Sequence, residues 1–280
     1  RSHFILIDFH GLLCYILSMK KFAICCNHEI PNSVQVKDKL VYFLKDAEIL
    51  DIDGLKDGFD FVFVIGGDGT ILKTARFYAK YQTPIFGINL GRLGFLSQSS
   101  EQEIDTAVEK ILNGKYILQD RIMLKSGNYT ALNDFVIKSC DSGRTANFSL
   151  KINDKFVCDY LADGIIVSTP TGSTAYGLSA GGPVLNPSLN AFVIVPICPH
   201  TLTARPIVVP DSEKITVCTD GKNLLSADGQ EFYEFDSEVC IEKSEFNAKL
   251  ALIEGSEFYS VLKNKLNWAT TPTYMKHADF

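Results

Sequence analysis

The stretch Val62-Phe63-Val64-Ile65-Gly66-Gly67-Asp68-Gly69-Thr70 decides how the first half of this 280-residue chain folds. A largely apolar run, Phe59–Ile65, ends in two glycines, and a segment with apolar residues at helical spacing, Ile71–Tyr81, follows. Such an apolar run is typical of a parallel strand buried on both faces. We therefore predict a buried strand, a glycine-rich turn and a helix, in that order.

The same alternation continues on both sides of this stretch. Strand-like runs lie at Phe22–Cys26 and Pro84–Ile88, and helix-like periodicity covers Ser33–Asp46 and Glu103–Leu112. Strands that alternate with helices indicate a parallel sheet with covering helices. We predict an α/β N-terminal domain with a parallel, Rossmann-like sheet over residues 19–114.

Beyond Lys115 the pattern changes to short apolar or alternating runs separated by turn residues, which is typical of an all-β unit. We assign residues 115–250 to a β-rich C-terminal domain, whose one expected helix starts after Thr171. Residues 251–280 carry an amphipathic helix, Phe258–Leu266, that we expect to return to the first domain. The runs are Phe135–Ile137, Phe148–Ile152, Phe156–Tyr160, Ile165–Ser168, Phe192–Pro196, Ile215–Thr219 and Val239–Glu242. No linker separates the domains, so we expect a ligand-binding cleft between them.

Composition excludes several classes of protein. The net charge is −6 with no basic block, which argues against duplex nucleic acid as a partner. The eight cysteines form no C-x-x-C pair and have no zinc-finger spacing, which favours reduced thiols in a cytoplasmic protein and no protein-bound metal. The apolar run Phe4–Leu17 is interrupted and too short for a membrane span. We interpret residues 1–18 as an extension that need not be native, before a natural start at Met19, with a weak signal anchor as the alternative.

The glycine-rich turn predicts a phosphate site. Glycines let the backbone approach a ligand, and the start of a helix offers amide N–H groups and partial positive charge. The turn is neither a G-x-G-x-x-G fingerprint nor a Walker A loop. Asp68 is unexpected there because a carboxylate repels phosphate. It is either a general base for an attacking hydroxyl or a helix N-cap, and the turn alone favours neither.

Three stretches of the second half carry further chemistry. Asn133 and Asp134 precede a strand and can bind a purine edge or a ribose hydroxyl, with a simple turn as the alternative. The segment from Asp163 to Pro183 runs from an apolar strand into a dense series of small and hydroxyl residues, which suits a loop around a polar ligand better than a solvated loop. In the loop from Pro196 to Pro206, His200 and Arg205 are expected to have structural roles.

These motifs resemble known families. The turn Gly66–Thr70 resembles one shared by NAD kinases, diacylglycerol and sphingosine kinases and, more loosely, phosphofructokinases. Together with Pro84–Leu96, the later stretches resemble the NAD kinase family of bacterial type, from Met19 to Trp268. The resemblance implies an NAD kinase that phosphorylates the adenosine 2′-hydroxyl of NAD with ATP to give NADP and ADP. It also implies Mg²⁺ carried with ATP, a homodimer or homotetramer, and no nucleic acid or membrane partner.

The resemblance also implies roles for individual residues. Asp68 is the proton acceptor, and the turn lies at the phosphates. A departure from some relatives is Leu161, where they carry Arg. The residues implied in ligand binding are Gly66, Gly67, Gly69, Thr70, Asn133, Asp134, Arg144, Asp163, Thr174, Ala175, Tyr176, Gly177, Leu178, Ser179 and Gln230.

Two rival hypotheses use the same residues. A lipid or sugar kinase could share the turn, and activity on a lipid but not on NAD would establish it. A non-catalytic NAD(P)-binding sensor would bind the dinucleotide without consuming ATP. Asp68 argues against the sensor, because a pure binder gains nothing from a carboxylate in a phosphate-binding turn.

Overall fold

The computed structural model describes residues 20–30, 32–91, 94–140, 145–254 and 258–266, which form two compact units. The first unit comprises the described residues of 1–74, 83–118 and 251–280, and the second those of 75–82 and 119–250. The predicted extension at 1–18 lies outside the described residues. Within the described part of the chain, no helix is long and apolar enough to cross a membrane.

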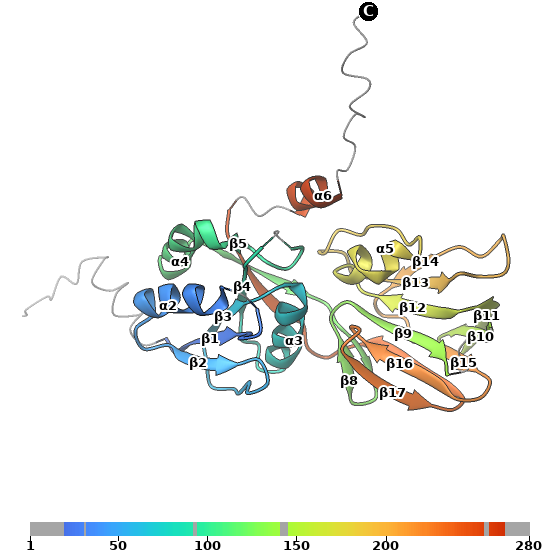
Figure 1. Ribbon diagram of the computed structural model, residues 1–280. Coiled ribbons are helices and arrows are strands. Elements are labelled where there is room, and N and C mark those ends of the chain that lie inside the picture. Colours follow the sequence, from blue (N-terminus) through green and yellow to red (C-terminus); the bar gives the residue numbers. More distant parts are fainter. Residues whose placement is uncertain (1–19, 31, 92–93, 141–144, 255–257, 267–280) are drawn as a thin grey trace, which may run out of the picture. The chain divides into compact units, whose positions relative to one another are not determined.

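The first unit is built on the predicted parallel sheet (Figure 1). Its strand order is β2-β1-β3-β4-β19-β6, and β5 pairs with β4. The pairs β1–β2, β1–β3, β3–β4 and β4–β5 are all parallel. The strands are β1 (Phe22–Cys26), β2 (Glu48–Asp51), β3 (Phe61–Ile65), β4 (Ile85–Asn89), β5 (Ser99–Ser100), β6 (Ile117–Arg121) and β19 (Ala248–Leu252). The α/β prediction for this part of the chain is confirmed.

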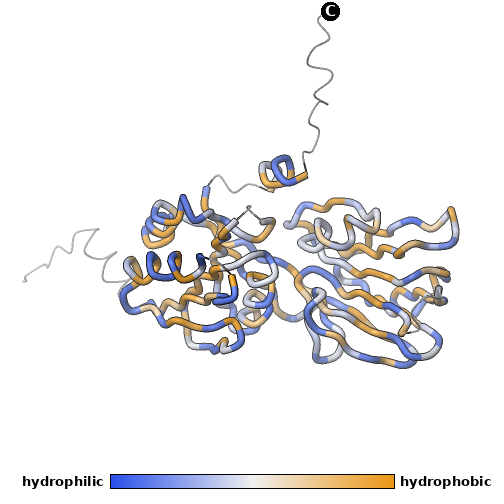
Figure 2. Tube along the Cα trace, viewed as in Figure 1, coloured by the Kyte–Doolittle hydropathy of each residue, from blue (hydrophilic) through white to orange (hydrophobic). Residues whose placement is uncertain are grey.

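Apolar residues follow these strands (Figure 2) and form the core with the covering helices. All five residues of β3 are buried, as expected of a central parallel strand. From α2 (Ser33–Phe43) come Val36 and Leu40, and from α4 (Ile104–Leu112) come four buried residues at helical spacing. The turn Glu101–Glu103 (η1) leads into α4, and α6 (Phe258–Leu266) has the predicted bounds.

Helix α3 (Asp68–Ala79) starts immediately after the glycine-rich turn, three residues before the predicted start at Ile71. Sequence periodicity could not detect this first turn because Asp68, Gly69 and Thr70 are not apolar. The helix belongs to both units, since residues up to Thr74 lie in the first and those from Ala75 in the second.

Apart from the end of α3 and two short helices after β12, the second unit is built of β-strands, as predicted, and contains two six-stranded sheets (Figure 1). Their orders are β11-β10-β15-β18-β7-β8 and β14-β13-β12-β9-β16-β17. The strands of the first sheet are β7 (Leu124–Ser126), β8 (Tyr129–Ala131), β10 (Ala146–Ile152), β11 (Lys155–Ala162), β15 (Ile215–Thr219) and β18 (Glu238–Lys243). Those of the second are β9 (Asp134–Ser139), β12 (Gly164–Ser168), β13 (Ala191–Ile197), β14 (Ile207–Pro210), β16 (Asn223–Ala227) and β17 (Glu231–Phe235).

Alternate residues of both sheets meet in one core. Phe148 and Val217 come from the first sheet, and Phe135, Val167 and Phe192 from the second. Period-two alternation places the intervening residues of each strand on the outer face. On the outer face of the second sheet, Val136 and its neighbours form a smaller apolar cluster with the segment after β12. That segment contains the short helices η2 (Gly172–Thr174) and α5 (Tyr176–Ser179), where a helix after Thr171 was predicted.

Candidate functional site

The glycine-rich turn is held tightly at the start of α3. The amides of Thr70 and Ile71 donate to the carbonyl of Gly67 at 3.0 and 3.1 Å. A side chain at Gly66 would collide with that of Thr70, which explains a glycine at this position. Because the start of a helix concentrates N–H groups and partial positive charge, this turn is suited to phosphate.

The carboxylate of Asp68 is held by a second segment of the first unit. It accepts hydrogen bonds from the amides of Phe95 (3.0 Å) and Leu96 (3.3 Å), and Nζ of Lys265 lies 3.7 Å from Oδ2. The Cα of Gly94 abuts the carboxylate so closely that a side chain there would overlap it. Asp68 is thus the first residue of α3 and bonds to amides outside the helix, so the N-cap alternative is wrong.

The two hydrogen bonds from backbone amides leave the Asp68 carboxylate able to accept a further hydrogen bond. An ionised carboxylate has about four acceptor sites, and 36% of the Asp68 side chain is exposed. The two amides fix the orientation of the group. It can therefore accept a further hydrogen bond from a ligand hydroxyl without reorienting.

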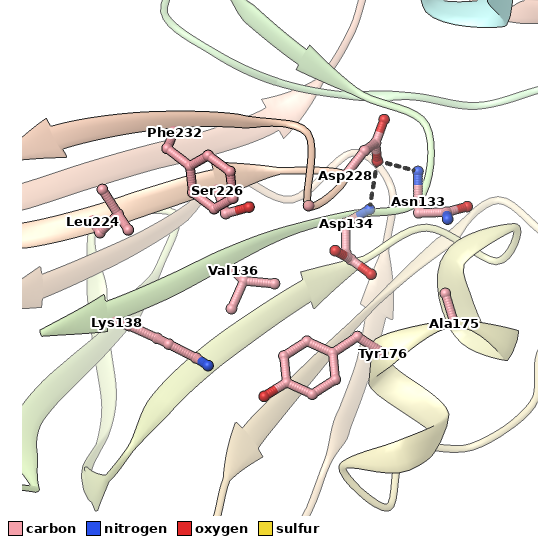
Figure 3. A pocket seen from close by; sticks show the side chains of 11 residues that line it. Asn133, Asp134, Val136, Lys138, Ala175, Tyr176, Leu224, Ser226, Asp228 and Phe232 are labelled. Atoms are coloured by element: carbon pink, nitrogen blue, oxygen red, sulfur yellow. Dashed lines mark hydrogen bonds between the residues drawn. The ribbon is translucent and has the colours of Figure 1, made fainter. Parts of the chain in front are cut away.

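A pocket of about 260 Å³ lies in the second unit, on the outer face of its second sheet. Figure 3 shows Tyr176 and Phe232 bordering it, with Asp134, Val136 and Lys138 of β9 between the two rings. The volume is slightly below the roughly 300–1,000 Å³ of sites for drug-sized ligands. The pocket is lined by Asn133, Asp134, Val136, Lys138, Ala175, Tyr176, Leu224, Ser226, Asp228, Gly229 and Phe232.

The composition of the pocket suits a flat heteroaromatic ring with polar edges. Phe232 and Tyr176 are 58% and 38% exposed, although aromatic side chains of this size are usually covered. Nζ of Lys138 lies 5.4 Å from the centre of the Tyr176 ring. Rings of this kind stack on bases, and a nearby ammonium group attracts a phosphate.

Asp228 anchors the polar end of the pocket (Figure 3). Its carboxylate accepts hydrogen bonds from the amides of Leu132 (3.0 Å), Asn133 (2.7 Å) and Asp134 (3.1 Å). Its own amide donates to the carbonyl of Asp134 at 2.9 Å, and its φ of 54° lies in the left-handed region. Three consecutive amides that point at one carboxylate fix the backbone from which the predicted ligand-binding side chains project.

Asp134 and Asp228 form a buried acidic pair. Burial, together with the nearby charge of Asp228, raises the pKa of Asp134 to about 7. Burial also raises the pKa of Asp228, but its amide donors and Arg76 lower it. We therefore assign the ionised form to Asp228 and the protonated form to Asp134. Near neutral pH, Asp134 can both donate and accept a hydrogen bond.

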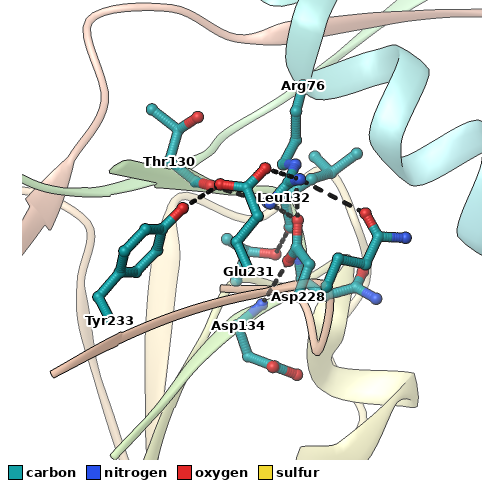
Figure 4. A network of polar contacts seen from close by, with 10 residues as sticks. Arg76, Thr130, Leu132, Asp134, Asp228, Glu231 and Tyr233 are labelled. Carbon is teal, nitrogen blue, oxygen red and sulfur yellow. Dashed lines mark hydrogen bonds and ion pairs between the residues drawn. The ribbon is translucent and has the colours of Figure 1, made fainter. Parts of the chain in front are cut away.

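Arg76 joins the C-terminal half of α3 to this pair (Figure 4). Its Nε lies 3.5 Å from Oδ2 of Asp228, and its Nη2 lies 2.7 Å from Oε1 of Glu231. Glu231 also accepts a hydrogen bond from Tyr233, whose ring stacks on Tyr129. The side chains of Arg76 and Asp228 are 7% and 0% exposed, so this ion pair is buried.

The hydroxyl-rich segment after β12 uses its hydroxyl groups mainly for its own fold. Thr169 donates to the carbonyl of Leu132 at 2.6 Å, and Ser173 donates to the carbonyl of Pro170 at 2.7 Å. Gly172 lies against the backbone of Asn133, where a side chain would not fit. The small residues thus bring this segment against the Asn133–Asp134 motif. That these hydroxyl groups also contact a ligand stays a prediction.

The predicted binding residues fall into separate groups. Asn133, Asp134, Ala175 and Tyr176 line the pocket, whereas Thr174, Gly177, Leu178 and Ser179 belong to the same segment but do not line it. The turn residues Gly66, Gly67, Gly69 and Thr70 lie in the first unit. Arg144 lies outside the described residues.

Asp163 and Gln230 do not line the pocket. Asp163 is exposed and precedes β12, at the opposite end from Ser168, which pairs with Asp134. Gln230 accepts a hydrogen bond from Arg76 at 3.4 Å. Arg205 donates to the carbonyls of Leu202 and Ala204 in its own loop, in keeping with its expected structural role.

Sequence reasoning missed seven lining residues, some of which carry a usable signal. Val136 and Lys138 follow Asp134 at a spacing of two, so a strand that begins at Asp134 places all three on one face. Ser226 and Leu224 are paired with Val136 and Lys138 across β9 and β16, which no local pattern shows. Asp228, Gly229 and Phe232 follow β16 and could be placed only once that pairing was known.

No group of three or more His, Cys, Asp or Glu side chains suited to a metal ion occurs among the described residues. The seven cysteines in this part of the chain are free thiols. A divalent cation at the glycine-rich turn would thus need most of its ligands from elsewhere, such as nucleotide phosphates.

Comparison with known proteins bears on both units. Residues 27–116 match the ATP-NAD kinase N-terminal domain, and residues 132–253 match the ATP-NAD kinase C-terminal domain. The NAD kinase of Carboxydothermus hydrogenoformans is 41% identical over 237 residues, covering 80% of this chain and 85% of that protein. The NAD kinase of Clostridium botulinum (strain ATCC 19397 / Type A) is 38% identical over 273 residues, covering 89% and 97%.

Solved structures agree with the sequence matches. The crystal structure of an NAD kinase from Archaeoglobus fulgidus in complex with ATP superposes with a TM-score of 0.73 at 30% identity, covering 89% of this chain and 98% of that one. Yeast NADH kinase complexed with NADH superposes with a TM-score of 0.78 at 22% identity, covering 90% and 89%. The second likeness concerns the fold alone.

Proposed function

The chain belongs to the ATP-NAD kinase family, and from that premise we propose that the pocket of the second unit binds NAD and that Asp68 accepts the proton of its adenosine 2′-hydroxyl. The reaction is the phosphorylation of NAD with ATP, which makes the chain a phosphotransferase. Family membership replaces the lipid or sugar kinase hypothesis, and the activity of the family replaces the sensor hypothesis.

The observation that carries the residue assignment is the Asp68 carboxylate. It stands at a turn built for phosphate, oriented by the amides of Phe95 and Leu96 and still partly exposed. A phosphoryl acceptor must lose a proton as it attacks, and a base within hydrogen-bond distance can take it. Most of the rate enhancement in such transfers comes from positioning and charge neutralisation, and the base adds a smaller factor.

The pocket supports the binding half of the proposal. Tyr176 and Phe232 can hold a base of the dinucleotide between them, and Asn133 and Asp134 can bind polar edges of that base or of its ribose. The ammonium group of Lys138 can attract a phosphate of the same ligand. We assign the ATP phosphates to the Gly66–Thr70 turn, with Mg²⁺ as part of the substrate MgATP.

Two further assignments belong to the proposal. We place the protein in the cytoplasm because its described cysteines are unpaired, in keeping with a reducing compartment. We propose a homodimer or homotetramer because the edge strands β11 and β14 expose Phe156, Val157 and Val208. Light scattering at several protein concentrations tests the second assignment, and a monomer throughout would reject it.

The test of the proposed function is NADP formation from NAD and MgATP, read with an NADP-specific dehydrogenase. The wild-type protein should form NADP. Asp68→Asn should lower kcat by ~10²–10⁴-fold, the range for loss of a general base. NAD binding, measured by calorimetry, should be retained because Asp68 does not line the pocket.

Each outcome has a separate meaning. Absence of NADP with the wild type, with ATP and then with polyphosphate as donor, would reject the kinase assignment. NADP formed at an unchanged rate by Asp68→Asn would reject only the role of the base. Loss of NAD binding in that variant would show that Asp68 acts on the ligand before chemistry.

A further inference from the structure

The glycine-rich turn contains no cation of its own. The sequence from Val62 to Leu72 has neither Lys nor Arg, unlike a Walker A loop, in which a lysine contacts the phosphates. The next cation along the chain, Lys73, forms an ion pair with Asp53 at 2.6 Å. Because Asp68 adds negative charge at the turn, any protein cation that assists the Mg²⁺ of MgATP at the transferring phosphoryl group must come from another segment.

Lys265, near the end of α6, lies beside the Asp68 carboxylate at the glycine-rich turn. Its Nζ lies 3.7 Å from Oδ2 of Asp68 and 5.0 Å from the centre of the Phe95 ring. Phe95 also donates its amide to the same carboxylate. Three segments distant in sequence thus meet around one carboxylate, and 32% of the Lys265 side chain stays exposed and reachable by a ligand.

We propose that Lys265 is a catalytic residue that contacts the γ-phosphoryl group of ATP and supplies the positive charge that the Gly66–Thr70 turn lacks. This inference rests on the proposed function of Asp68. Without ATP the ammonium group lies beside the Asp68 carboxylate, and with ATP it also contacts an oxygen of the transferring group.

The distances make this contact feasible. A base lies about 2.6–3.2 Å from the hydroxyl whose proton it takes, and that hydroxyl attacks phosphorus from about 3–3.5 Å. An ammonium group 3.7 Å from the base is therefore within reach of the phosphoryl oxygens. A lysine side chain has a flexible four-carbon stem and three donors, so it can contact the carboxylate and a phosphate oxygen together.

In the phosphoryl transfer, Lys265 forms no covalent bond and transfers no proton. The oxygen of the NAD hydroxyl forms a bond to the γ-phosphorus of ATP, and the bond from that phosphorus to the bridging oxygen breaks to release ADP. Asp68 takes the hydroxyl proton and later releases it to solvent. Lys265 stays protonated throughout and stabilises the negative charge on the phosphoryl oxygens.

The experiment compares Lys265→Met with Lys263→Met, a matched control two residues earlier on α6. Lys263 is exposed and forms no ion pair with any described residue. Binding of ATP and of ADP is measured by calorimetry without NAD, and kcat and KM for NAD are measured in the NADP assay. Melting temperatures show whether either variant has lost its fold.

We expect Lys265→Met to weaken ATP binding about tenfold and to leave ADP binding within twofold, because only ATP carries the γ-phosphate. Its kcat should fall about tenfold or more, less than the ~10²–10³-fold for a fully buried donor, with KM for NAD unchanged. Lys265→Arg should recover part of kcat, and Lys263→Met should match the wild type.

Equal loss of ATP and ADP binding, or an unchanged kcat, would overturn the assignment of Lys265. A wild-type protein that forms no NADP would overturn the proposed function instead. The ATP and ADP comparison would still decide whether Lys265 contacts the γ-phosphate. The two failures are therefore distinguishable.

Discussion

Asp228 holds the backbone amide of Asp134 at 3.1 Å and at the same time opposes ionisation of the Asp134 carboxyl group. One buried carboxylate thus fixes both the position and the protonation state of its neighbour in the pocket. Arg76 balances the charge of Asp228 from a helix that begins at Asp68. The acid proposed to bind NAD is therefore linked to the acid proposed to act on it through one hydrogen bond, one ion pair and helix α3.

The raised pKa of Asp134 predicts a pH dependence of stability. The folded protein keeps this proton up to about pH 7, whereas the unfolded chain loses it near the ordinary value of 3.8. The contribution of this group to the free energy of unfolding is thus greatest below about pH 4 and is lost as pH rises through 7. The slope cannot exceed about 1.4 kcal/mol per pH unit.

The variant Asp134→Asn tests this prediction because its amide keeps the shape of the protonated acid and does not titrate. Urea unfolding of both proteins at pH 5 and pH 8 is the measurement. Relative to the wild type, the variant should be more stable at pH 8 than at pH 5. If the free energies of unfolding of the two proteins differed by the same amount at pH 5 and pH 8, Asp134 would already be ionised at pH 5.

Removal of the buried cation should destabilise the fold. Arg76→Met leaves Asp228 with its three amide donors but without a counter-charge, at a side-chain exposure of 0%. We expect a loss of roughly 1–3 kcal/mol in the free energy of unfolding, the cost of leaving a buried polar group incompletely compensated. Chemical denaturation measures it.

The matched control for Arg76→Met is Glu231→Gln. Glu231 is the second partner of Arg76, with 48% of its side chain exposed, so its removal should cost less than about 1 kcal/mol. If both variants lose the same stability, the pair with Asp228 does not dominate the network.

Contact between Gly172 and Asn133 predicts a loss of NAD affinity. The methyl group of Gly172→Ala would meet the backbone of Asn133, which cannot move aside without shifting Asp134. We expect NAD binding to weaken at least tenfold in calorimetry. Gly54→Ala is the control, because the φ of Gly54 is not in the left-handed region and a methyl group there would meet only the carbonyl oxygen of Asp51, at 3.8 Å. Unchanged NAD affinity in Gly172→Ala would contradict the assigned position of Asn133.

If a base of NAD stacks on the ring of Phe232, removal of this ring should weaken NAD binding. Loss of an aromatic ring that stacks on a base costs about 1–3 kcal/mol of binding free energy, so Phe232→Ala should weaken NAD binding about five- to 150-fold. Tyr42→Ala is the control, since Tyr42 is also an exposed aromatic residue, at 75%, but lies on α2 and does not line the pocket. Equal effects of the two substitutions would show that Phe232 does not touch the dinucleotide.

Elements with strong local patterns were predictable from the sequence, and those defined by pairing were not. β1 and α6 have the predicted bounds because their apolar residues and flanking turns are local signals. β17 alternates exposed and half-buried residues at the edge of its sheet, and no apolar run identifies it. β19 joins the sheet of the first unit from the far end of the chain, which only the three-dimensional structure reveals.

The same distinction applies to the site. Asp68 could be identified because an acid in a glycine-rich turn is chemically unusual. Asp228 could not be identified, because the three amides that donate hydrogen bonds to it lie 94 to 96 positions earlier in the sequence. Lys265 is one of two lysines on an amphipathic helix, and only its distance from Asp68 distinguishes it.

Gly94 has a consequence for how this sequence can vary. Since a Cβ at this position would overlap Oδ1 of Asp68, the position has room for a hydrogen atom and nothing larger. In a saturation mutagenesis library selected for NADP synthesis, positions 68 and 94 should show the same complete intolerance, for opposite reasons. Substitution at position 68 would remove the reacting carboxylate, and substitution at position 94 would add an atom that displaces this carboxylate. Intolerance to substitution therefore marks the immediate surroundings of a reacting group as strictly as the group itself.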